Sequence, residues 1–562
     1  MCSRPTRSNS WTGRIIANAN TIRLAAYSSV AASSVYSIVI AVIAVIAAAP
    51  ILAAVVSLFQ DTGDVWPHLV QYVLPEALLN TLWLAAGVAL IAGTIGVALA
   101  WIVAAYEFPG RGFFNWALLL PMAMPGYVLA FAFAAIFEFT GPIQGLWRDV
   151  FGDTLAFPEI GARAASILTL SLVLYPYVFL IVREAFASQG VRGLEVAQSC
   201  GLKPLQGFFK VSLPMARPFI VGGVSLAVME SLADFGTVQL YNYSTFTTAI
   251  YRAWYGLFSL ESAQQLSLVL ITLVLLALLV ERRFRGMARY TTSDAAASRS
   301  RITLHGRGAV LATSICAAVF ALAFLLPTSL IALWSFGAFA EEFDSRYWQF
   351  AANTLLLAVM AAMLVTSIAV IMAYAVRRQP GPANDFLARV ATLGYAVPGT
   401  VLAVGFFVPI AAFSRFINQL LGFSGAETIA LQSSLAVILL AYMSRFLAVA
   451  HSPVNGALSR ISPSIEDASR GMGVSGLQML LRVHLPILRP AILTGALLVF
   501  VDVMKELPIT LMTRPFGWDT LAVRVFQLTT EGEWQRAALP ALGIVVVGLI
   551  PVVLLTRQRN NA

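Results

Sequence analysis

Charged residues are scarce in this sequence: of its 562 residues, 11% are charged and 59% are hydrophobic. In soluble globular proteins about a quarter of the residues are charged, so the composition excludes that class and indicates a membrane protein. The net charge of +9 could suggest a nucleic-acid partner. However, the basic residues lie mostly in the tails and in short loops between apolar runs, which is the positive-inside pattern of membrane proteins. We therefore predict no nucleic-acid partner.

Cysteine and histidine are rare as well. The three cysteines, Cys2, Cys200 and Cys316, are scattered along the chain. Neither their number nor their spacing suggests a disulfide framework or a zinc site. The four histidines are dispersed too, and without a His or Cys cluster we predict no tight metal site.

A phosphate-binding loop is also missing. The sequence contains no Gly-x-x-x-x-Gly-Lys-Ser/Thr motif and no Gly-Lys pair, so it lacks the backbone cradle that ATP hydrolysis of this type requires. We predict that the chain is not an enzyme and has neither catalytic nor cofactor-binding residues. If ATP drives its function, the ATP must be bound by another polypeptide.

What the sequence does contain is a series of long apolar runs. A membrane-spanning helix needs about 20 apolar residues, and by that measure each half of the chain has six spans. Those of the first half lie at 35–59, 78–105, 114–139, 164–187, 216–234 and 263–281. Those of the second half lie at 308–336, 351–376, 386–413, 430–450, 488–507 and 536–556. The predicted fold is all-α, with about 12 transmembrane helices in two fused six-helix halves.

The loop charges predict how these spans are oriented. The connections around Asp64 and Glu342 are acidic, whereas a group of arginines, Arg282 to Arg301, follows the sixth span. Basic loops face the cytoplasm, so we expect a multi-pass protein of the bacterial inner membrane with both termini cytoplasmic. A signal peptide at the N-terminus is the alternative, but its apolar core is about 7–15 residues long, and the run at 35–59 is longer.

These boundaries divide the chain into six parts. They are a cytoplasmic N-terminal segment (1–34), a first span with an external loop (35–77), a first transmembrane domain (78–281), a cytoplasmic linker (282–307), a seventh span with an external loop (308–350) and a second transmembrane domain (351–555). From about Tyr290 to Arg301 the linker is rich in Ser, Thr, Ala and Arg, which indicates an exposed tether.

The two halves repeat one another. At an offset of 273 (353 − 80), Asn80-Thr81 matches Asn353-Thr354 and Pro125-Gly126 matches Pro398-Gly399; at an offset of 272 (486 − 214), Leu213-Pro214 matches Leu485-Pro486 and Thr248 matches Thr520. An internal duplication of this length predicts two similar bundles packed around a pseudo-two-fold axis, with a central pathway between them.

The repeat includes a polar loop, Leu194–Pro218 in the first half and Glu466–Pro490 in the second. Unpaired backbone groups cannot lie in lipid, so we expect each loop outside the bilayer with short helices of its own. Gly201 and Gly473 are placed to end a helix in a left-handed turn. Small side chains let another protein approach, so we interpret the loops as a first and a second elbow that dock into a partner. An ordinary loop packed on its own bundle is the alternative.

Four carboxylates are predicted inside the membrane, two in the fifth span of each half. Glu230 and Asp234 match Asp502 and Glu506 at an offset of 272 (502 − 230 and 506 − 234). Their spacing of four places each pair on one helix face. Such groups usually face a cavity and mark a pathway, and carboxylate oxygens suit a hard cation. The alternative is structural ion pairing, with Lys505 and Arg445 as candidate partners.

The elbows resemble the cytoplasmic loop of the permeases of binding-protein-dependent ABC importers, in which Glu-Ala-Ala, three residues, Gly and, later, Leu-Pro follow one another. Glu195-Val196-Ala197 with Gly201 keeps most of this pattern, and Asp467-Ala468-Ser469 with Gly473 keeps less of it. The resemblance covers residues 80–281 and 353–555 and implies the fold of a type I importer permease. It also implies coupling to a separate ATPase by six residues, Glu195, Ala197, Gly201, Asp467, Ala468 and Gly473. The implied partners are cytoplasmic ATPase subunits, two in number, which bind the ATP, and a periplasmic solute-binding protein.

A closer resemblance concerns the ends of the fifth spans. Met229–Thr237, Lys505–Pro508 and Arg514–Phe516 look like the corresponding runs of the fused two-half permeases of ferric-iron importers, which implies ferric iron as the substrate. Thiamine permeases share the fused layout and polyamine permeases share the loop, so these substrates are alternatives. A secondary transporter would also fit duplicated halves, and a membrane scaffold without transport is a further possibility.

Overall fold

The computed structural model describes residues 35–60, 63–152, 157–189, 199, 201–285, 301–423, 428–474 and 476–560. The predicted N-terminal segment, 1–34, lies outside the described residues, as do Glu195 and Ala197 of the first elbow and nearly all of the predicted tether. The described chain is almost entirely helical, and each of its two strands has two residues.

The first half begins with the span Val35–Phe59, whose last turn is η1 (Ser57–Phe59). It continues with α2 (Val65–His68), η2 (Leu69–Val73), α3 (Leu74–Ala105), β1 (Tyr106–Glu107), α4 (Arg111–Ala117), η3 (Leu120–Ala123), α5 (Gly126–Phe137), α6 (Pro142–Phe151), α7 (Ala162–Gln189), α9 (Pro204–Gly207), η4 (Phe208–Ser212), α10 (Leu213–Ala233), α11 (Gly236–Leu240), α12 (Phe246–Tyr255) and α13 (Leu260–Arg285).

The second half follows the same order. It consists of β2 (Ile302–Thr303), α14 (Arg307–Phe320), η5 (Ala321–Leu325), α15 (Leu326–Glu342), α16 (Ser345–Arg378), α17 (Pro382–Thr392), η6 (Leu393–Ala396), α18 (Gly399–Leu421), η8 (Leu431–Ser433), α19 (Leu435–Leu458), α20 (Pro463–Gly471), α21 (Gly476–Met479), η9 (Leu480–His484), α22 (Leu485–Met504), α23 (Pro508–Thr513), α24 (Leu521–Thr530) and α25 (Trp534–Asn560).

The described helices confirm an all-α membrane fold. Eleven of them are long and apolar enough to cross a membrane, and α25 adds a shorter apolar stretch, Trp534–Ile550. This agrees with the prediction of about 12 transmembrane helices in two fused halves. Most predicted spans correspond to one such helix.

Two predicted spans, 114–139 and 386–413, are wrong as continuous helices. In the first, α5 begins only at Gly126, after the short helices α4 and η3, and in the second, α18 begins at Gly399 after α17 and η6. Pro125 and Pro398 have extended ψ angles of 146° and 145°. A proline also pushes the residue before it out of the helical region, so the repeated Pro-Gly pair breaks each span although its sequence is apolar throughout.

Proline also explains the wide helical turns of the structure. Each π-helical turn, η2, η4, η5 and η9, is followed directly by a Leu-Pro pair at the start of the next α-helix. Proline has no N–H to donate and its ring clashes with the preceding turn, so the turn before it widens instead of ending. The repeated Leu213-Pro214 and Leu485-Pro486 therefore join each elbow to the following span by an unbroken helical path.

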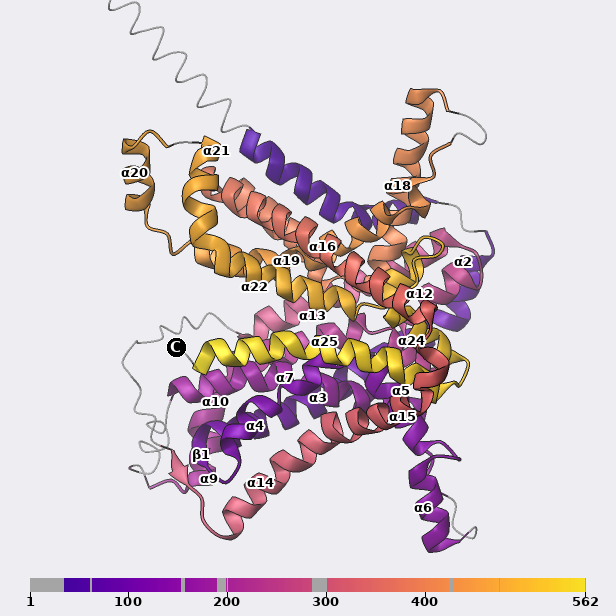
Figure 1. Ribbon diagram of the computed structural model, residues 1–562, viewed down its shortest axis with the longest axis vertical. Coiled ribbons are helices and arrows are strands. Elements are labelled where there is room, and N and C mark those ends of the chain that lie inside the picture. Colours follow the sequence, from indigo (N-terminus) through magenta and orange to yellow (C-terminus); the bar gives the residue numbers. More distant parts are fainter. Residues whose placement is uncertain are drawn as a thin grey trace, which may run out of the picture.

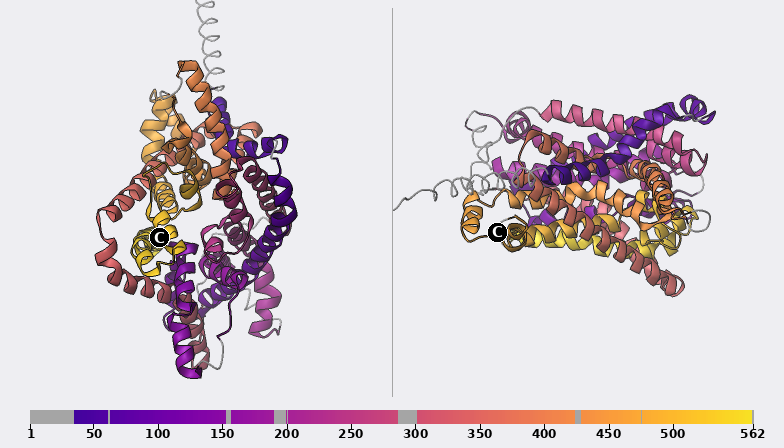
Figure 2. Two further views of the ribbon diagram at one scale, coloured as in Figure 1. Left: turned by 90° about the vertical axis from the view of Figure 1, so that its right-hand side faces the viewer. Right: turned by 90° about the horizontal axis from the view of Figure 1, so that it is seen from above.

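The first span of each half packs against the other half. Ser444 Oγ of α19 donates to the carbonyl of Ala47 in the first span at 2.8 Å. In the opposite direction, Thr313 Oγ1 of α14 donates to the carbonyl of Pro109 at 3.0 Å. Figure 1 shows the first span, in indigo, beside α16 and α19, and α14 running beneath α3 and α4. The halves are thus interlocked rather than merely side by side, as the end view in Figure 2 also shows.

The end of the predicted linker is docked on the first half. Ile302 and Thr303 of β2 pair in parallel with Tyr106 and Glu107 of β1, and Arg301 Nη1 lies 3.7 Å from Glu107 Oε2. The C-terminal end of the linker is therefore a structural contact, whereas the prediction of a tether concerns residues outside the described part of the chain.

The elbows lie at one end of the molecule. In Figure 1, α9 of the first elbow, α20 of the second elbow and the end of α25 are all at the left, whereas α2 and α6 lie at the opposite end. The two halves therefore have the same orientation, as predicted. At the far end, Glu342 is not in an exposed acidic loop: it ends α15, is buried, and forms ion pairs with Arg524 and Arg536.

The repeated Asn-Thr pair holds the same junction in both halves. Asn80 Nδ2 donates to Ser244 O at 2.9 Å, and Asn353 Nδ2 donates to Asp519 O at 3.0 Å. The next residue, Thr81 or Thr354, accepts the first backbone N–H of α12 or α24 through its Oγ1. These bonds fix where the two short helices begin.

This junction corrects one predicted match between the halves. The first residues of α12 and α24 are Phe246 and Leu521, an offset of 275 (521 − 246). Thr520 therefore corresponds to Thr245, since both are N-cap residues, and not to Thr248. The offset between the halves increases by three residues, from 272 to 275, between the fifth spans and this junction. Short matching sequence segments do not reveal this insertion.

Candidate functional site

The four predicted carboxylates lie at the ends of α10 and α22. The prediction that each pair shares one helix face is wrong, because α10 ends at Ala233 and α22 at Met504. Asp234 is extended, with a ψ of 135°, and Glu506 lies in the turn that leads to α23. Glu230 and Asp502 thus belong to the spans, whereas Asp234 and Glu506 belong to the turns that follow them.

Asp234 and Glu506 hold the short helices α11 and α23. The Asp234 carboxylate accepts the N–H of Thr237 at 3.1 Å, the N–H of Val238 at 3.3 Å and the hydroxyl of Thr237 at 3.0 Å. Glu506 accepts the N–H of Ile509 at 3.0 Å, and the N–H and hydroxyl of Thr510 at 3.1 and 3.2 Å. A carboxylate suits the unpaired N–H groups of a helix N-terminus, so these two groups are satisfied structurally.

The repeated Pro-Gly pairs pack against these capped turns. A Cβ atom added to Gly126 would lie 2.6 Å from Thr237 Oγ1, and one added to Gly399 would lie 2.7 Å from Glu506 Oε1. Both distances are far below van der Waals contact, so only glycine fits. The two motifs that repeat most clearly in the sequence therefore meet in space in each half.

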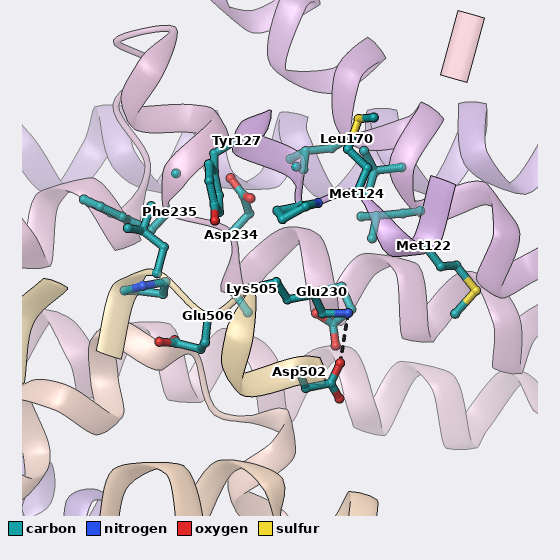
Figure 3. Close-up of a pocket in the computed structure, with 18 of the residues that line it drawn as sticks. Met122, Met124, Tyr127, Leu170, Glu230, Asp234, Phe235, Asp502, Lys505 and Glu506 are labelled. Atoms are coloured by element: carbon teal, nitrogen blue, oxygen red, sulfur yellow. Dashed lines mark ion pairs between the residues drawn. The ribbon is translucent and has the colours of Figure 1, made fainter. Parts of the chain in front are cut away.

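All four carboxylates line one cavity of about 140 Å³ between the halves. It has room for several water molecules. Its wall includes Lys505 and Arg445 and three aromatic residues with hydroxyl groups, Tyr127, Tyr177 and Tyr395. Figure 3 shows Glu230 of the first half next to Lys505 and Asp502 of the second, while Glu506 points away from that group.

The charges within the cavity are partly paired. Lys505 Nζ lies 2.9 Å from Asp502 Oδ1, the ion pair that the sequence offered as an alternative to a pathway role. Glu230 interacts with the hydroxyl of Tyr395 in η6. Arg445 donates to the carbonyl of Val397 at 3.1 Å and lies over the ring of Phe446. The cavity therefore joins charged groups of both halves in one place.

The second elbow presents the side chains that the sequence singled out. Asp467 and Ala468 lie on the exposed face of α20, and Asp467 Oδ1 lies 2.6 Å from Arg470 Nη1. Gly473 has a φ of +82°, the left-handed turn that was predicted to end this helix. In the first elbow, Gly201 has a φ of +77°, whereas Glu195 and Ala197 lie outside the described residues.

Sequence reasoning missed Glu466, the buried residue next to Asp467. Its carboxylate contacts Arg377, Arg470 and His484. Burial acts to raise the pKa of Glu466, but the hydrogen bond and charge of Arg377, with His484 and Arg470, outweigh it and leave the pKa below its usual value. No repeat signals this residue, because Leu194 occupies the matching position (466 − 272 = 194).

The described residues contain no group of three or more His, Cys, Asp or Glu side chains that could hold a metal ion. The cavity carboxylates are divided between two capping positions, one ion pair with Lys505, and Glu230.

Both halves match a known protein family. The pattern described as "Binding-protein-dependent transport system inner membrane component" matches residues 93–281 and 365–558. The chain is 26% identical over 491 residues to the Fe(3+)-transport system permease protein FbpB 2 of Haemophilus influenzae, covering 86% of this chain and 90% of that protein. It is 30% identical over 190 residues to the sulfate transport system permease protein CysT of Escherichia coli, covering 34% of this chain and 67% of that protein.

Among solved structures, the chain is similar to one from a bacterial alginate ABC transporter in complex with a periplasmic protein that holds an alginate pentasaccharide. The identity is 15% and the TM-score is 0.34, and the match covers 44% of this chain and 91% of the other.

Proposed function

Since this chain belongs to the family of binding-protein-dependent transport system inner membrane components and is a permease subunit of an ABC importer, we propose that it carries ferric iron across the inner membrane. The family membership confirms the resemblance inferred from the elbows, and the substrate is the step beyond it. One observation carries the proposal: Glu230 of the first half and Asp502 of the second line one cavity between the halves.

The charge of this cavity favours a cation. Four carboxylates and two basic side chains line it, so it carries two excess negative charges when all six groups are ionised (4 − 2 = 2). Opposite charges attract strongly where water is partly excluded, and carboxylate oxygens suit a hard ion such as ferric iron. The relative named for Fe(3+) transport supports this choice, because it aligns with both halves of this chain.

Sulfate is a second candidate. Lys505 and Arg445 are cations within the cavity, and a permease named for sulfate transport aligns with a third of this chain. The pairing of Lys505 with Asp502 weakens this candidate, because it leaves less positive charge for an anion. Thiamine and polyamines are cations and compete with iron on the same grounds.

We propose that the elbows are the docking sites through which ATPase subunits drive transport. Two cytoplasmic ATPase subunits, which bind the ATP, each dock one elbow, through Glu195, Ala197 and Gly201 or through Asp467, Ala468 and Gly473. The exposure of Asp467 and Ala468 on α20 supports this docking. A periplasmic solute-binding protein delivers the substrate at the opposite end of the molecule. Both termini then lie in the cytoplasm, on the side of the elbows.

The substrate can be tested with the complete transporter in vesicles. Uptake of labelled ferric iron, sulfate, thiamine and spermidine is compared for the wild type, Glu230→Gln and Asp234→Asn. Both variants remove one negative charge from the same cavity, but asparagine keeps a capping oxygen. We expect wild-type uptake of iron, a loss of about tenfold or more in Glu230→Gln, because pathway charges are functional, and a loss of less than about threefold in Asp234→Asn.

Two results would contradict the proposal. Uptake of sulfate but not of iron by the wild type would mean that the substrate is sulfate and not ferric iron. Iron uptake that is unchanged after Glu230, Asp234, Asp502 and Glu506 have all been converted to amides would show that the cavity charge has no part in transport.

A further inference from the structure

The inner face of the second elbow carries a buried ionic cluster. Glu466 and Ser469 of α20 lie one turn apart and are only 8% and 5% exposed, whereas Asp467 and Ala468 between them face outward. A helix whose outer face docks a partner needs an inner face fixed to its own protein. The contacts of Glu466 show how this is achieved.

Glu466 links the elbow to two membrane spans. Its Oε1 atom lies 2.6 Å from Nε of Arg377, at the end of α16, and 3.3 Å from Nε2 of His484, in the turn that leads into α22. Its Oε2 atom lies 3.1 Å from Arg470 Nη2 of the same helix. Both oxygens of one carboxylate are thus engaged by groups from three helical segments.

Arg377 extends this connection to a third span. Its guanidinium also donates to the carbonyls of Leu458, the last residue of α19, and Ile461, which precedes α20. One turn earlier on α16, Tyr374 Oη donates to the carbonyl of Gly476 at 2.8 Å, on the far side of the elbow. Helix α20 is therefore held to α16 by contacts that precede it and by one that follows it.

The first half lacks the side chains for such a cluster. At the offset of 272, Leu194 matches Glu466 and Ser212 matches His484; at the offset of 273 that holds before the loop, Ala104 matches Arg377. None of the three can form an ion pair. The two halves therefore differ in how an elbow can be fixed to its spans.

We propose that Glu466 is a positioning residue for energy coupling: with Arg377 and His484 it fixes the second elbow to α16 and α22, so that a displacement of this elbow moves these spans directly. This inference rests on the proposed docking of an ATPase to the elbow. Without the carboxylate charge, Arg377 would lose its ion pair and keep only the carbonyls of Leu458 and Ile461, and His484 would lose its contact with a carboxylate. The elbow would then move independently of the spans, and ATP hydrolysis would no longer be coupled to transport.

The test measures uptake and ATP hydrolysis per assembled complex, in vesicles that contain permease, ATPase and solute-binding protein. We expect Glu466→Gln to assemble normally and to hydrolyse ATP within about twofold of the wild type, while its uptake falls by about tenfold. Asp467→Asn is the matched control, one residue away on the docking face. There we expect weaker assembly, so that hydrolysis and uptake fall together.

A second variant and a second measurement keep the inference testable if Glu466→Gln fails to assemble. Arg377→Lys keeps the positive charge but loses the planar guanidinium group with its several N–H donors. We expect its ratio of uptake to ATP hydrolysis to lie between those of the wild type and Glu466→Gln. Hydrogen exchange of α20 should quicken in both variants whatever the substrate is. If uptake and hydrolysis fall in proportion in the Glu466 and Arg377 variants, or if uptake is unchanged, the inference is wrong. If the wild-type permease binds no ATPase, the proposed function fails instead.

Discussion

At the scale of single residues, the matched carboxylates fall into two kinds. Asp234 and Glu506 each accept three hydrogen bonds from the first turn of a short helix, so their oxygens are occupied. Glu230 and Asp502 remain on the spans and face each other across the halves, with Lys505 beside them. The first kind caps short helices, a role that neither reading of the sequence foresaw. In the second kind Asp502 forms the ion pair with Lys505 that the sequence offered as an alternative, and a pathway role is proposed for Glu230 and Asp502.

This distinction predicts different consequences for two substitutions of Glu506. The N–H groups of Ile509 and Thr510 donate to different oxygens of Glu506. Glu506→Gln keeps one of these acceptors, whereas Glu506→Ala leaves both N–H groups unpaired in a buried turn. We expect alanine to destabilise the protein by about 1–2 kcal/mol relative to glutamine. Thermal unfolding of the purified permease in detergent measures the difference. Equal midpoints for the two variants would mean that the turn does not need its cap.

The residues that sequence reasoning found and missed have a common explanation. A spacing of four suggested that Glu230 and Asp234 share a helix face, and this failed because the helix ends between them, at Ala233. Gly473 was predicted correctly because a left-handed turn favours glycine wherever it occurs. Glu466 was missed because its partner Arg377 lies 89 residues away, and a contact at that separation leaves no local pattern.

At the scale of the elements, helix α20 of the second elbow is followed by a left-handed turn that only glycine adopts easily. Gly473 has a φ of +82°, whereas Gly471, two residues earlier, is the last residue of α20 and has no positive φ. Neither has an atom within 4 Å of an added Cβ. Alanine should therefore cost about 1–2 kcal/mol at Gly473 and little at Gly471.

We expect this strain to loosen the docking end of the elbow. Gly473→Ala should weaken association of the permease with its ATPase by about fivefold to tenfold. This corresponds to a loss of about 1.0–1.4 kcal/mol of binding free energy. Gly471→Ala, the same chemical change beside it, should alter the association by less than about twofold. Titration of the purified ATPase onto the permease in nanodiscs measures both. Equal effects of the two substitutions would show that contact, and not the turn, sets the affinity.

Element boundaries were predictable where polar residues mark them and not where proline acts inside an apolar run. The span 114–139 was predicted as one helix because its composition is uniform, yet Pro125 divides it. The same residue type has the opposite effect at Leu213-Pro214, where the turn widens and the helix continues. Whether a proline interrupts a helix or only widens one turn depends on whether the preceding turn can rearrange, and the local sequence does not predict this.

At the scale of the whole molecule, the interlocked first spans hold the halves together. Ala47 of the first span is bonded to Ser444, and Pro109 is bonded to Thr313 of α14. The duplication predicted two bundles with a shared pathway, but not this exchange of spans. The exchange depends on pairings between residues hundreds of positions apart, which periodicity and composition cannot reveal.

The exchange predicts that the halves associate without a covalent link. Residues 1–292 and 293–562, expressed together as two chains, should copurify in detergent, because each carries a span that packs on the other. A first chain that begins at residue 61 lacks the first span and should copurify at most about one tenth as well, since that span supplies buried apolar contacts to the second half. Equal recovery with and without the first span would contradict the interlocked arrangement.

The central claim is that an ATPase outside this chain drives a cation through the cavity shared by its halves. Iron uptake into vesicles is measured with the complete transporter, with and without ATP on the elbow side, and again after ionophores have abolished all ion gradients. The account predicts uptake that requires ATP and the ATPase subunits and that is unaffected by the ionophores. Uptake that persists without ATP and ceases when the gradients are abolished would contradict it.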